Sequence, residues 1–140
     1  MTCLYVGRWI PRVGSRDFGI IFPILHFLSA AELRLVNGSN HYEGRLEIFL
    51  NGQWGTVCGD YWDIRDARVA CRQLGLPGVI AATLVGSFGS GSGPIYLDDL
   101  LCTGSESNLE SCPHAGIGVH NCSHTNDAGA RCRPAGKTFP

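Results

Sequence analysis

Asp63-Ile-Arg-Asp-Ala-Arg-Val-Ala-Cys-Arg-Gln-Leu-Gly75 predicts the single helix around which the rest of the chain is organised. Asp63 is a favourable N-cap residue, and Gly75 readily adopts the left-handed conformation that ends a helix. Apolar residues spaced three or four apart share one helix face: Ile64, Ala67, Cys71 and Leu74. Because Cys71 lies on this face, we expect a disulfide from the helix to a neighbouring sheet.

A β-hairpin is predicted just before this helix. In residues 45–50, Leu46, Ile48 and Leu50 alternate with polar residues, which indicates a strand with one buried face. Asn51-Gly52 tolerates the positive φ angles of a type I′ turn, and residues 53–57 return as the partner strand. Shorter strands are expected at residues 33–36, 95–101 and 128–132. The Gly-rich residues 86–93 are interpreted as a flexible connection, because neither a Lys nor a long helix follows them.

Six cysteines are distributed over residues 58–132: Cys58, Cys71, Cys102, Cys112, Cys122 and Cys132. A domain of roughly 100 residues buries limited apolar area, so covalent cross-links contribute much of its stability. An even count with irregular spacing indicates a disulfide framework, which places the domain outside the cytosol. Six free thiols in a cytosolic protein are the alternative, and the spacing alone leaves fifteen pairings open.

The N-terminal residues 1–31 predict a secretory signal peptide. Arginines precede the apolar residues 18–28, and small residues follow at Ser29-Ala30-Ala31. Cleavage after Ala31 removes the odd Cys3 and leaves six cysteines that can all pair. An uncleaved membrane anchor is the alternative, as is a wrongly assigned start of the chain; a retained Cys3 would be free for intermolecular pairing.

Residues 32–133 are predicted to form one domain, followed by a tail at residues 134–140. After position 31 the chain has eight Lys and Arg against eleven Asp and Glu, a formal charge of −3. This balance gives no electrostatic basis for general or sequence-specific nucleic-acid binding. Any anion recognition therefore has to come from a local basic patch.

Seven stretches of this domain recur together, in this order, in one known family: Tyr42-Glu-Gly-Arg-Leu-Glu47, Trp54-Gly-Thr-Val-Cys58, Tyr61-Trp-Asp63, Asp66-Ala67, Val69-Ala-Cys-Arg-Gln-Leu-Gly75, Leu97-Asp-Asp-Leu-Leu-Cys102 and Asp127-Ala-Gly129. They resemble the scavenger receptor cysteine-rich domain, and the six-cysteine set looks like its group A. The resemblance implies the pairs Cys58–Cys122, Cys71–Cys132 and Cys102–Cys112. It also implies an α+β fold in which a curved antiparallel sheet cradles one helix.

The same resemblance implies non-catalytic ligand recognition outside the cell. The expected partners are extracellular polyanions, microbial surface polymers or protein ligands, in a secreted or membrane-anchored glycoprotein of innate immunity. A structural or adhesion module of a larger receptor is the alternative. An enzyme is not expected, because no Gly-x-Ser-x-Gly elbow or comparable nucleophile context is present.

Calcium is a possible cofactor of this family, but binding here is predicted to be weak. The calcium-binding relatives carry carboxylates where this chain has Gly59 and Asn126, which leaves Asp60 as the one acidic ligand of that site. Calcium affinity depends on the number of charged ligands. A second candidate set, Asp98 or Asp99 with Asn121, corresponds to a cation site in some relatives; alternatively, the two aspartates end a strand by hydrogen bonding.

The candidate ligand-binding residues are Arg65, Arg68 and Arg72, which form a basic strip on the helix. Arginine binds sulfate and phosphate groups bidentately. A solvated face balanced by Asp63 and Asp66 is the alternative.

Two further patterns are of interest around Cys122. His120, Cys122 and His124 have the spacing of zinc ligands, but a disulfide sulfur is not a thiolate, so these histidines and His114 are expected to be surface residues. Asn37-Gly-Ser39 and Asn121-Cys-Ser123 are N-glycosylation sequons. We expect Asn37 to be the better acceptor, because Asn121 adjoins a bridged cysteine.

Overall fold

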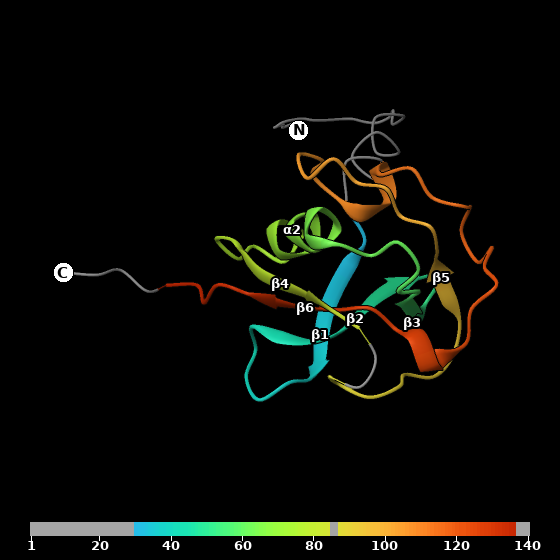
Figure 1. Cartoon of the computed structure of the whole chain (residues 1–140), viewed down its shortest axis with the longest axis horizontal. Coiled ribbons are helices and arrows are strands. Elements are labelled where there is room, and N and C mark those ends of the chain that lie inside the picture. Colours follow the sequence, from blue (N-terminus) through green and yellow to red (C-terminus); the bar gives the residue numbers. More distant parts are fainter. Residues whose placement is uncertain (1–29, 85–86, 137–140) are drawn as a thin grey trace, which may run out of the picture. The chain divides into compact units, whose positions relative to one another are not determined.

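The computed structural model describes residues 30–84 and 87–136 of the chain. The described residues from Ala31 onward form one compact unit, and the description below concerns this unit alone (Figure 1). The predicted signal segment, with Cys3, lies outside the described residues except for Ala30 and Ala31.

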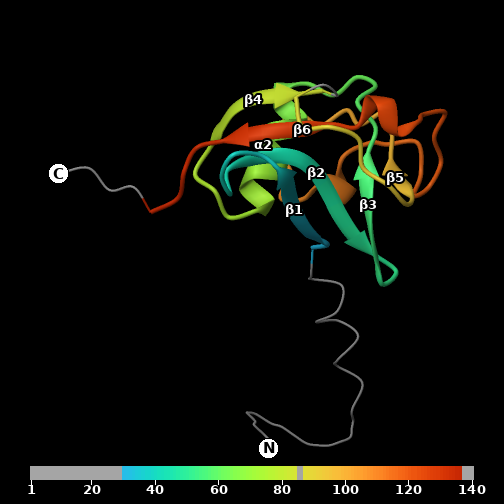
Figure 2. The same ribbon diagram turned by 90° about the horizontal axis from the view of Figure 1, so that it is seen from below.

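A six-stranded sheet forms the body of the unit (Figures 1 and 2). Its strands are β1 (Glu32–Asn37), β2 (Glu43–Leu50), β3 (Gln53–Val57), β4 (Val79–Thr83), β5 (Ile95–Leu97) and β6 (Gly129–Cys132). The order is β4-β6-β2-β3-β5, and β1 pairs with β2. All pairings are antiparallel except β3 with β5, which is parallel. The predicted α+β fold, a curved sheet that cradles one helix, is confirmed; the sheet is mostly antiparallel and becomes mixed through the parallel β3–β5 pairing.

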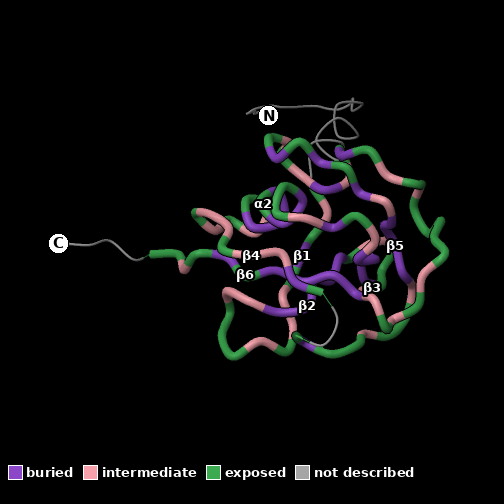
Figure 3. Tube along the Cα trace, in the orientation of Figure 1, coloured by how far each residue is buried: buried purple, intermediate pink, exposed green. Residues whose placement is uncertain are grey.

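Strand β2 organises the sheet because it pairs with three other strands. Residues 44–49 pair with β1, while residues 43–45 pair with β6 and residues 47–50 pair with β3. Most of β2 is buried (Figure 3), and Leu46 and Ile48 are completely buried in the core. Arg45 and Glu47 point to the opposite face, as predicted, yet they too are buried, at 7% and 6% exposure. The expectation of one buried face was therefore incomplete.

The β2–β3 hairpin turn has the conformation that the Asn-Gly pair predicts. Asn51 and Gly52 have φ angles of 52° and 79°, and Leu50 pairs with Gln53 across the turn. Two successive positive φ angles are the requirement of a type I′ turn, whose twist matches that of the flanking strands. This local prediction is confirmed.

Helix α2 (Ile64–Gln73) also begins and ends where predicted. The Asp63 side chain accepts hydrogen bonds from the backbone of Arg65 and Asp66, and the Asp66 side chain accepts one from the Asp63 N–H. This reciprocal capping box satisfies amides that the first turn leaves without partners. After the helix, Gly75 has a φ of 80°.

The buried face of α2 is rotated from the expected one. Ile64 is 40% exposed, so its placement in the core was wrong. The buried residues are Asp66, Ala67, Val69, Ala70 and Cys71. Small side chains on this face let the helix pack closely against β4, β6 and the 3₁₀ turn η1 (Leu109–Ser111).

Three disulfides link the elements: Cys58–Cys122, Cys71–Cys132 and Cys102–Cys112. These are the pairs that the family resemblance implied. The second joins α2 to β6 across the core, and both of its cysteines are buried. The third closes a short loop, because its cysteines are only 10 residues apart.

The structure differs from the predicted strands in two places. Strand β5 ends at Leu97 rather than continuing to residue 101, because the Asp98 side chain accepts a hydrogen bond from the Asp99 N–H and Asp99 has a φ of 57°. Strand β4 was not predicted. Its sequence, Val-Ile-Ala-Ala-Thr, has no polar alternation, so its periodicity did not identify it, although the turn signal Pro77-Gly78 stands directly before it.

Ala31, the last residue of the predicted signal segment, is part of the packed unit. It packs against the core, its N–H donates to Glu110 at 2.8 Å, and its carbonyl accepts from Gln73 at 2.7 Å. Cleavage after Ala31 would therefore remove two hydrogen bonds that hold the start of β1.

Removing the buried disulfide should destabilise the domain strongly. We expect Cys71→Ala with Cys132→Ala to lower the free energy of unfolding by about 2–5 kcal/mol, because this bridge closes a separation of 61 residues. Urea unfolding at equilibrium measures the change. The matched control is Cys102→Ala with Cys112→Ala, whose separation is 10 residues. Chain entropy predicts a cost about 1.5 kcal/mol smaller for the control, and a larger cost would contradict this reasoning.

Candidate functional site

The three predicted arginines lie on the exposed side of α2, but their surroundings differ. Arg65 forms an ion pair with Asp63, with Nη2 and Oδ2 2.7 Å apart. The Arg65 hydrogen bond lowers the pKa of Asp63. Both side chains are substantially exposed, so this pair adds little stability. The negative charge of Asp63 nevertheless offsets the positive charge that Arg65 would present to a ligand.

Arg72 is positioned by the loop that the Cys102–Cys112 bridge closes. Its guanidinium donates to the carbonyl oxygens of Gly104 at 2.7 Å and Glu106 at 2.6 Å. Carbonyl groups orient an arginine without neutralising its charge. Gly104 also approaches Arg68 closely, because a Cβ added there would lie 3.0 Å from the Arg68 Nη1 atom. The loop backbone and the two arginines therefore form one continuous surface.

The solvated-face alternative assumed that Asp66 balances the charge of these arginines at the surface, but Asp66 is not at the surface. It is 1% exposed, and its carboxylate accepts hydrogen bonds from the backbone N–H groups of Cys102 and Asp63, both at 2.9 Å. Burial raises the pKa of Asp66, against the effect of these bonds. Its role is to attach the 102–112 loop to the start of α2.

The first candidate calcium set is closed by an internal hydrogen bond. The Asn126 Nδ2 atom donates to Asp60 Oδ1 at 2.8 Å, and the Gly59 N–H donates to the Asn126 carbonyl. A side chain at position 59 would meet the Asn126 amide oxygen and a Leu84 methyl group, both 2.6 Å from its Cβ. Asp60 and Asn126 are therefore hydrogen-bonded to each other, and weak calcium binding stays a prediction.

The second candidate set lies next to the first. Asp98 is 2% exposed and accepts from the backbone N–H groups of Asp99 and Asn121. These hydrogen bonds are the ones expected if Asp98 ends a strand, which was the alternative to a cation site. Carboxylate oxygens of Asp60 and Asp98 lie within 4.8 Å of each other beside the Cys58–Cys122 bridge, whose sulfurs are not available as thiolates. Loss of hydration raises the pKa of Asp99, and the charges of Asp98 and Asp60 raise it further.

The histidines around Cys122 do not form a zinc site. The Nδ1 atom of His120 accepts from the Cys122 N–H at 3.0 Å, and Cys122 is in a disulfide. His114 Nδ1 similarly accepts from the Gly116 N–H. His124 is different, because its side chain is 26% exposed and both ring nitrogens have partners. Its assignment as a surface histidine was wrong.

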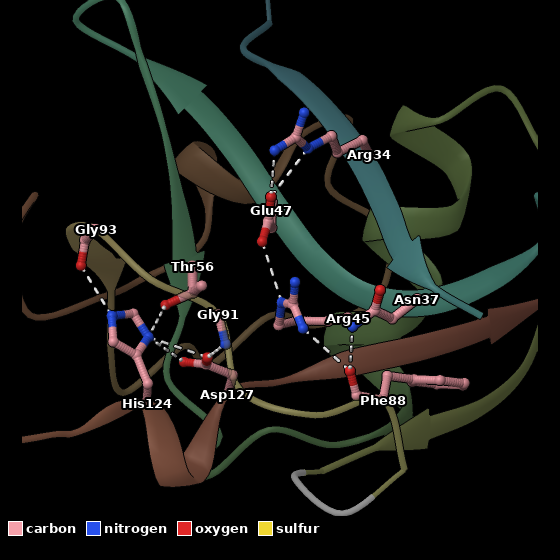
Figure 4. A network of polar contacts seen from close by, with 10 residues as sticks. All are labelled: Arg34, Asn37, Arg45, Glu47, Thr56, Phe88, Gly91, Gly93, His124 and Asp127. Atoms are coloured by element: carbon pink, nitrogen blue, oxygen red, sulfur yellow. Dashed lines mark hydrogen bonds and ion pairs between the residues drawn. The ribbon is translucent and has the colours of Figure 1, made fainter.

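A buried polar network, absent from our sequence-based prediction, lies beneath the Gly-rich loop (Figure 4). Glu47 accepts from Arg34 at 2.6 Å and from Arg45 at 3.0 Å, and Arg45 donates to the Phe88 carbonyl at 3.0 Å. Asp127 has a fully buried side chain and accepts from the Gly91 N–H at 2.7 Å. Residues 87–93 are thus hydrogen-bonded to the sheet, which corrects the interpretation of this segment as a flexible connection.

The sequons have different settings in the fold. Asn37 ends β1 with a φ of 69°, and its exposed side chain donates to the Phe88 carbonyl at 3.3 Å. Asn121 is exposed beside the bridged Cys122. Glycosylation of either residue remains a prediction.

A curled mixed sheet that carries one helix and three disulfides defines a cross-linked module of extracellular receptors. The chain belongs to the scavenger receptor cysteine-rich family, whose domain model matches residues 36–133. This family consists of recognition modules of secreted or membrane receptors and is generally non-enzymatic. Among the described residues, α2 and the short turns are neither long nor apolar enough to cross a membrane.

Individual relatives agree with this assignment. A scavenger receptor cysteine-rich domain superfamily protein of Patiria pectinifera is 49% identical over 104 residues, which are 74% of this chain and 9% of that protein. The third such domain of murine neurotrypsin is 50% identical, with a TM-score of 0.68 and coverage of 74% of this chain and 96% of that one. The domain of mouse MARCO, solved in a dimeric form, is 40% identical, with a TM-score of 0.61 and coverage of 79% and 99%.

Calcium should bind weakly, if at all, because Asn126 already satisfies Asp60. We expect titration calorimetry to give a Kd weaker than about 10⁻⁴ M, which is the tight limit for extracellular calcium modules. Gly59→Asp with Asn126→Glu should strengthen binding, since it adds two carboxylates and removes the amide; the exposed Leu84 side chain has to turn away from the new side chain at position 59. Asn126→Gln is the matched control, because it keeps an uncharged amide. A Kd tighter than about 10⁻⁴ M for the unaltered chain would contradict the prediction.

Glu106 should remain ionised to unusually low pH. Hydrogen bonds from the Thr103 and Gly104 backbone and the Thr103 hydroxyl hold the pKa of Glu106 at about 2, below its ordinary value of 4.5. Its contribution to stability is therefore complete above about pH 4.5 and is lost as the pH falls towards 2. NMR titration of the side-chain carboxyl carbon should locate this transition. In Thr103→Val, which loses the hydroxyl donor, the transition should move to higher pH.

Proposed function

We propose that this module recognises polyanions outside the cell through the exposed arginines of α2. Sulfated glycans and anionic microbial polymers are the ligand class with the matching charge. The surface comprises Arg65, Arg68 and Arg72 with the backbone of the 102–112 loop, and we call it the arginine strip. Arginine is suited to this role because its planar guanidinium binds sulfate and phosphate groups bidentately.

The observation that carries this proposal is the unequal pairing of the three side chains. Within residues 30–84 and 87–136, Arg65 has a carboxylate partner, whereas Arg68 and Arg72 have none within ion-pair distance. Arg72 is oriented in advance by the two loop carbonyls, so it loses less side-chain freedom when it binds. Arg68 and Arg72 are one helical turn apart and form the charged centre of the strip.

Catalysis is not part of this proposal, although His124, Asp127 and Thr56 lie together. Asp127 and the Thr56 hydroxyl both face the same ring nitrogen, Nδ1, at 3.0 and 3.4 Å. The other nitrogen, Nε2, is 2.8 Å from the Gly93 carbonyl. A triad needs the nucleophile on one nitrogen and the acid on the other, so this geometry does not support nucleophilic chemistry.

A second candidate function is a structural or adhesion module within a longer receptor. The matched relative supports this alternative, because the chain spans only 9% of its length. Ligand binding could then depend on other parts of such a protein. Binding of polyanions by the isolated module distinguishes the two candidates.

Heparin binding at low salt tests the arginine strip. We expect Arg68→Gln to weaken binding by roughly tenfold, about 1.4 kcal/mol, since it removes one charge-assisted contact. Arg65→Gln should have a smaller effect because Asp63 already offsets that charge. Binding should weaken steeply with salt, as exposed charges are screened within about 8–10 Å near physiological ionic strength. Affinity is measured by surface plasmon resonance.

Arg131→Gln is the matched control, because it removes one exposed, ion-paired arginine from β6 rather than from α2. Arg72→Gln needs a stability measurement alongside, since it also loses two hydrogen bonds to the 102–112 loop. The triple variant is therefore expected to loosen this loop as well as to abolish binding. Unchanged heparin binding by the folded Arg68→Gln variant would leave the adhesion-module function as the better candidate.

A further inference from the structure

The Asn51-Gly52 turn carries a chemical reactivity as well as a backbone conformation. An asparagine side-chain amide is chemically labile. The backbone nitrogen of the following residue can attack the side-chain carbonyl carbon, Cγ, and a glycine hinders this attack least because it has no Cβ. Asn37-Gly38 is the other asparagine–glycine pair in the chain. The two pairs have different surroundings in the fold.

The first pair is held at both of its residues. The Asn37 Nδ2 atom donates to the Phe88 carbonyl at 3.3 Å. The Gly38 backbone packs directly against the Glu43 carbonyl, so closely that a Cβ would overlap this oxygen. For the attack, the Asn37 side chain has to leave Phe88 and the backbone at Gly38 has to rotate. Each movement breaks contacts that the fold makes here.

The second pair is open to solvent. Asn51 and Gly52 are both exposed, and a Cβ added at Gly52 would have no heavy atom within 4 Å. Among the described residues, none makes a hydrogen bond with the Asn51 side chain. Rotation of the peptide between Asn51 and Gly52 disturbs the Leu50–Gln53 pair across the turn, but it displaces no packed side chain. The fold therefore restrains the Asn51 pair much less than the Asn37 pair.

We propose that Asn51 is the residue at which the folded domain deamidates spontaneously. In the first step the Gly52 nitrogen forms a bond to the Asn51 Cγ atom and gives up its proton, while the Cγ–Nδ2 bond breaks and the amide group leaves as ammonia. Water then adds to one of the two carbonyl carbons of the resulting succinimide ring and opens it, which yields aspartate or isoaspartate. Water is the only co-reactant, so the reaction requires no enzyme.

The isoaspartate product affects the hairpin through Tyr96 on β5. The Tyr96 hydroxyl donates to the Leu50 carbonyl at 2.8 Å and lies 3.1 Å from the Gln53 carbonyl, so it joins β5 to both residues that flank the turn. Isoaspartate adds one carbon to the backbone between these flanks, and a two-residue turn has no room for it. The aspartate product keeps the backbone length, and Asp-Gly suits the same type I′ turn. Isoaspartate therefore loosens the hairpin, whereas aspartate only adds an exposed negative charge.

Incubation of the folded, disulfide-bonded full chain at mildly alkaline pH tests the site. The protein is produced without N-glycans, because a glycan on Asn37 would block its amide. Peptide mapping by mass spectrometry follows both pairs, and labelling with isoaspartyl methyltransferase identifies the isoaspartate. We expect Asn51 to convert about fivefold to tenfold faster than Asn37, since the latter first has to lose a hydrogen bond and packed contacts. Equal rates, or faster conversion of Asn37, would overturn the proposal.

The same chain, reduced and denatured, is the matched control for the role of the fold. Without tertiary contacts, both asparagines precede a free glycine and should convert at similar rates. If the preference for Asn51 were as large in the denatured chain, the local sequence rather than the fold would cause it, and the proposal would fail.

A second measurement tests the effect on the hairpin. The isoaspartate form, separated by ion exchange, should unfold at a lower urea concentration than the unmodified protein. Asn51→Asp is the matched control, because it carries the new charge without the extra backbone carbon and should unfold close to the unmodified protein. Equal unfolding midpoints for the isoaspartate form and Asn51→Asp would contradict the loosening of the hairpin.

Discussion

The rest of the fold depends on the burial of both faces of β2. This strand pairs with β1 along one edge and with β6 and β3 along the other, so its backbone groups are satisfied throughout. Leu46 and Ile48 contribute to the apolar core that α2 covers. On the opposite face, Arg45 and Glu47 are covered by the Gly-rich loop and held by ion pairs and a carbonyl. Removing either charge would leave its partner buried and unpaired, which costs several kcal/mol.

This two-sided burial also explains how the candidate surfaces are held in place. The arginine strip is stationary because Asp66 and Arg72 attach the 102–112 loop to α2 from both ends of the helix. On the other side of the sheet, Asp127 attaches the Gly-rich loop through Gly91. In each case a charged side chain binds backbone groups of a loop. These polar contacts supplement the apolar residues that each loop buries, Phe88 in one and Leu109 in the other, which suits a small domain with a limited core.

Features encoded by a few adjacent residues could be predicted from the sequence. The Asn51-Gly52 turn and the N-cap of α2 depend on local backbone preferences, and the structure has both. Alternation in β2 correctly indicated which side chains share a face. It could not indicate that the second face is covered, because the covering loop is some 40 residues away and has no periodicity. The parallel pairing of β3 with β5 likewise depends on contacts distant in the sequence.

At the candidate site, helical spacing located the arginines, whereas the carbonyl partners of Arg72 lie on a loop without a local signal. His124 was misassigned for the same reason, since Gly93 and Thr56 reach it from other parts of the chain.

The two ends of the sheet are protected in different ways. At one end, the Tyr96 carbonyl of β5 accepts from the Gly118 N–H, so residues 115–118 cover that edge. At the other end, β4 is the last strand in the sheet order, and Ile80 is 55% exposed on it. Between Val79 and Ala81 the register of β4 against β6 shifts. A short strand with such a bulge is a poor template for a further strand, so this irregularity discourages neighbouring copies from joining edge to edge into larger aggregates.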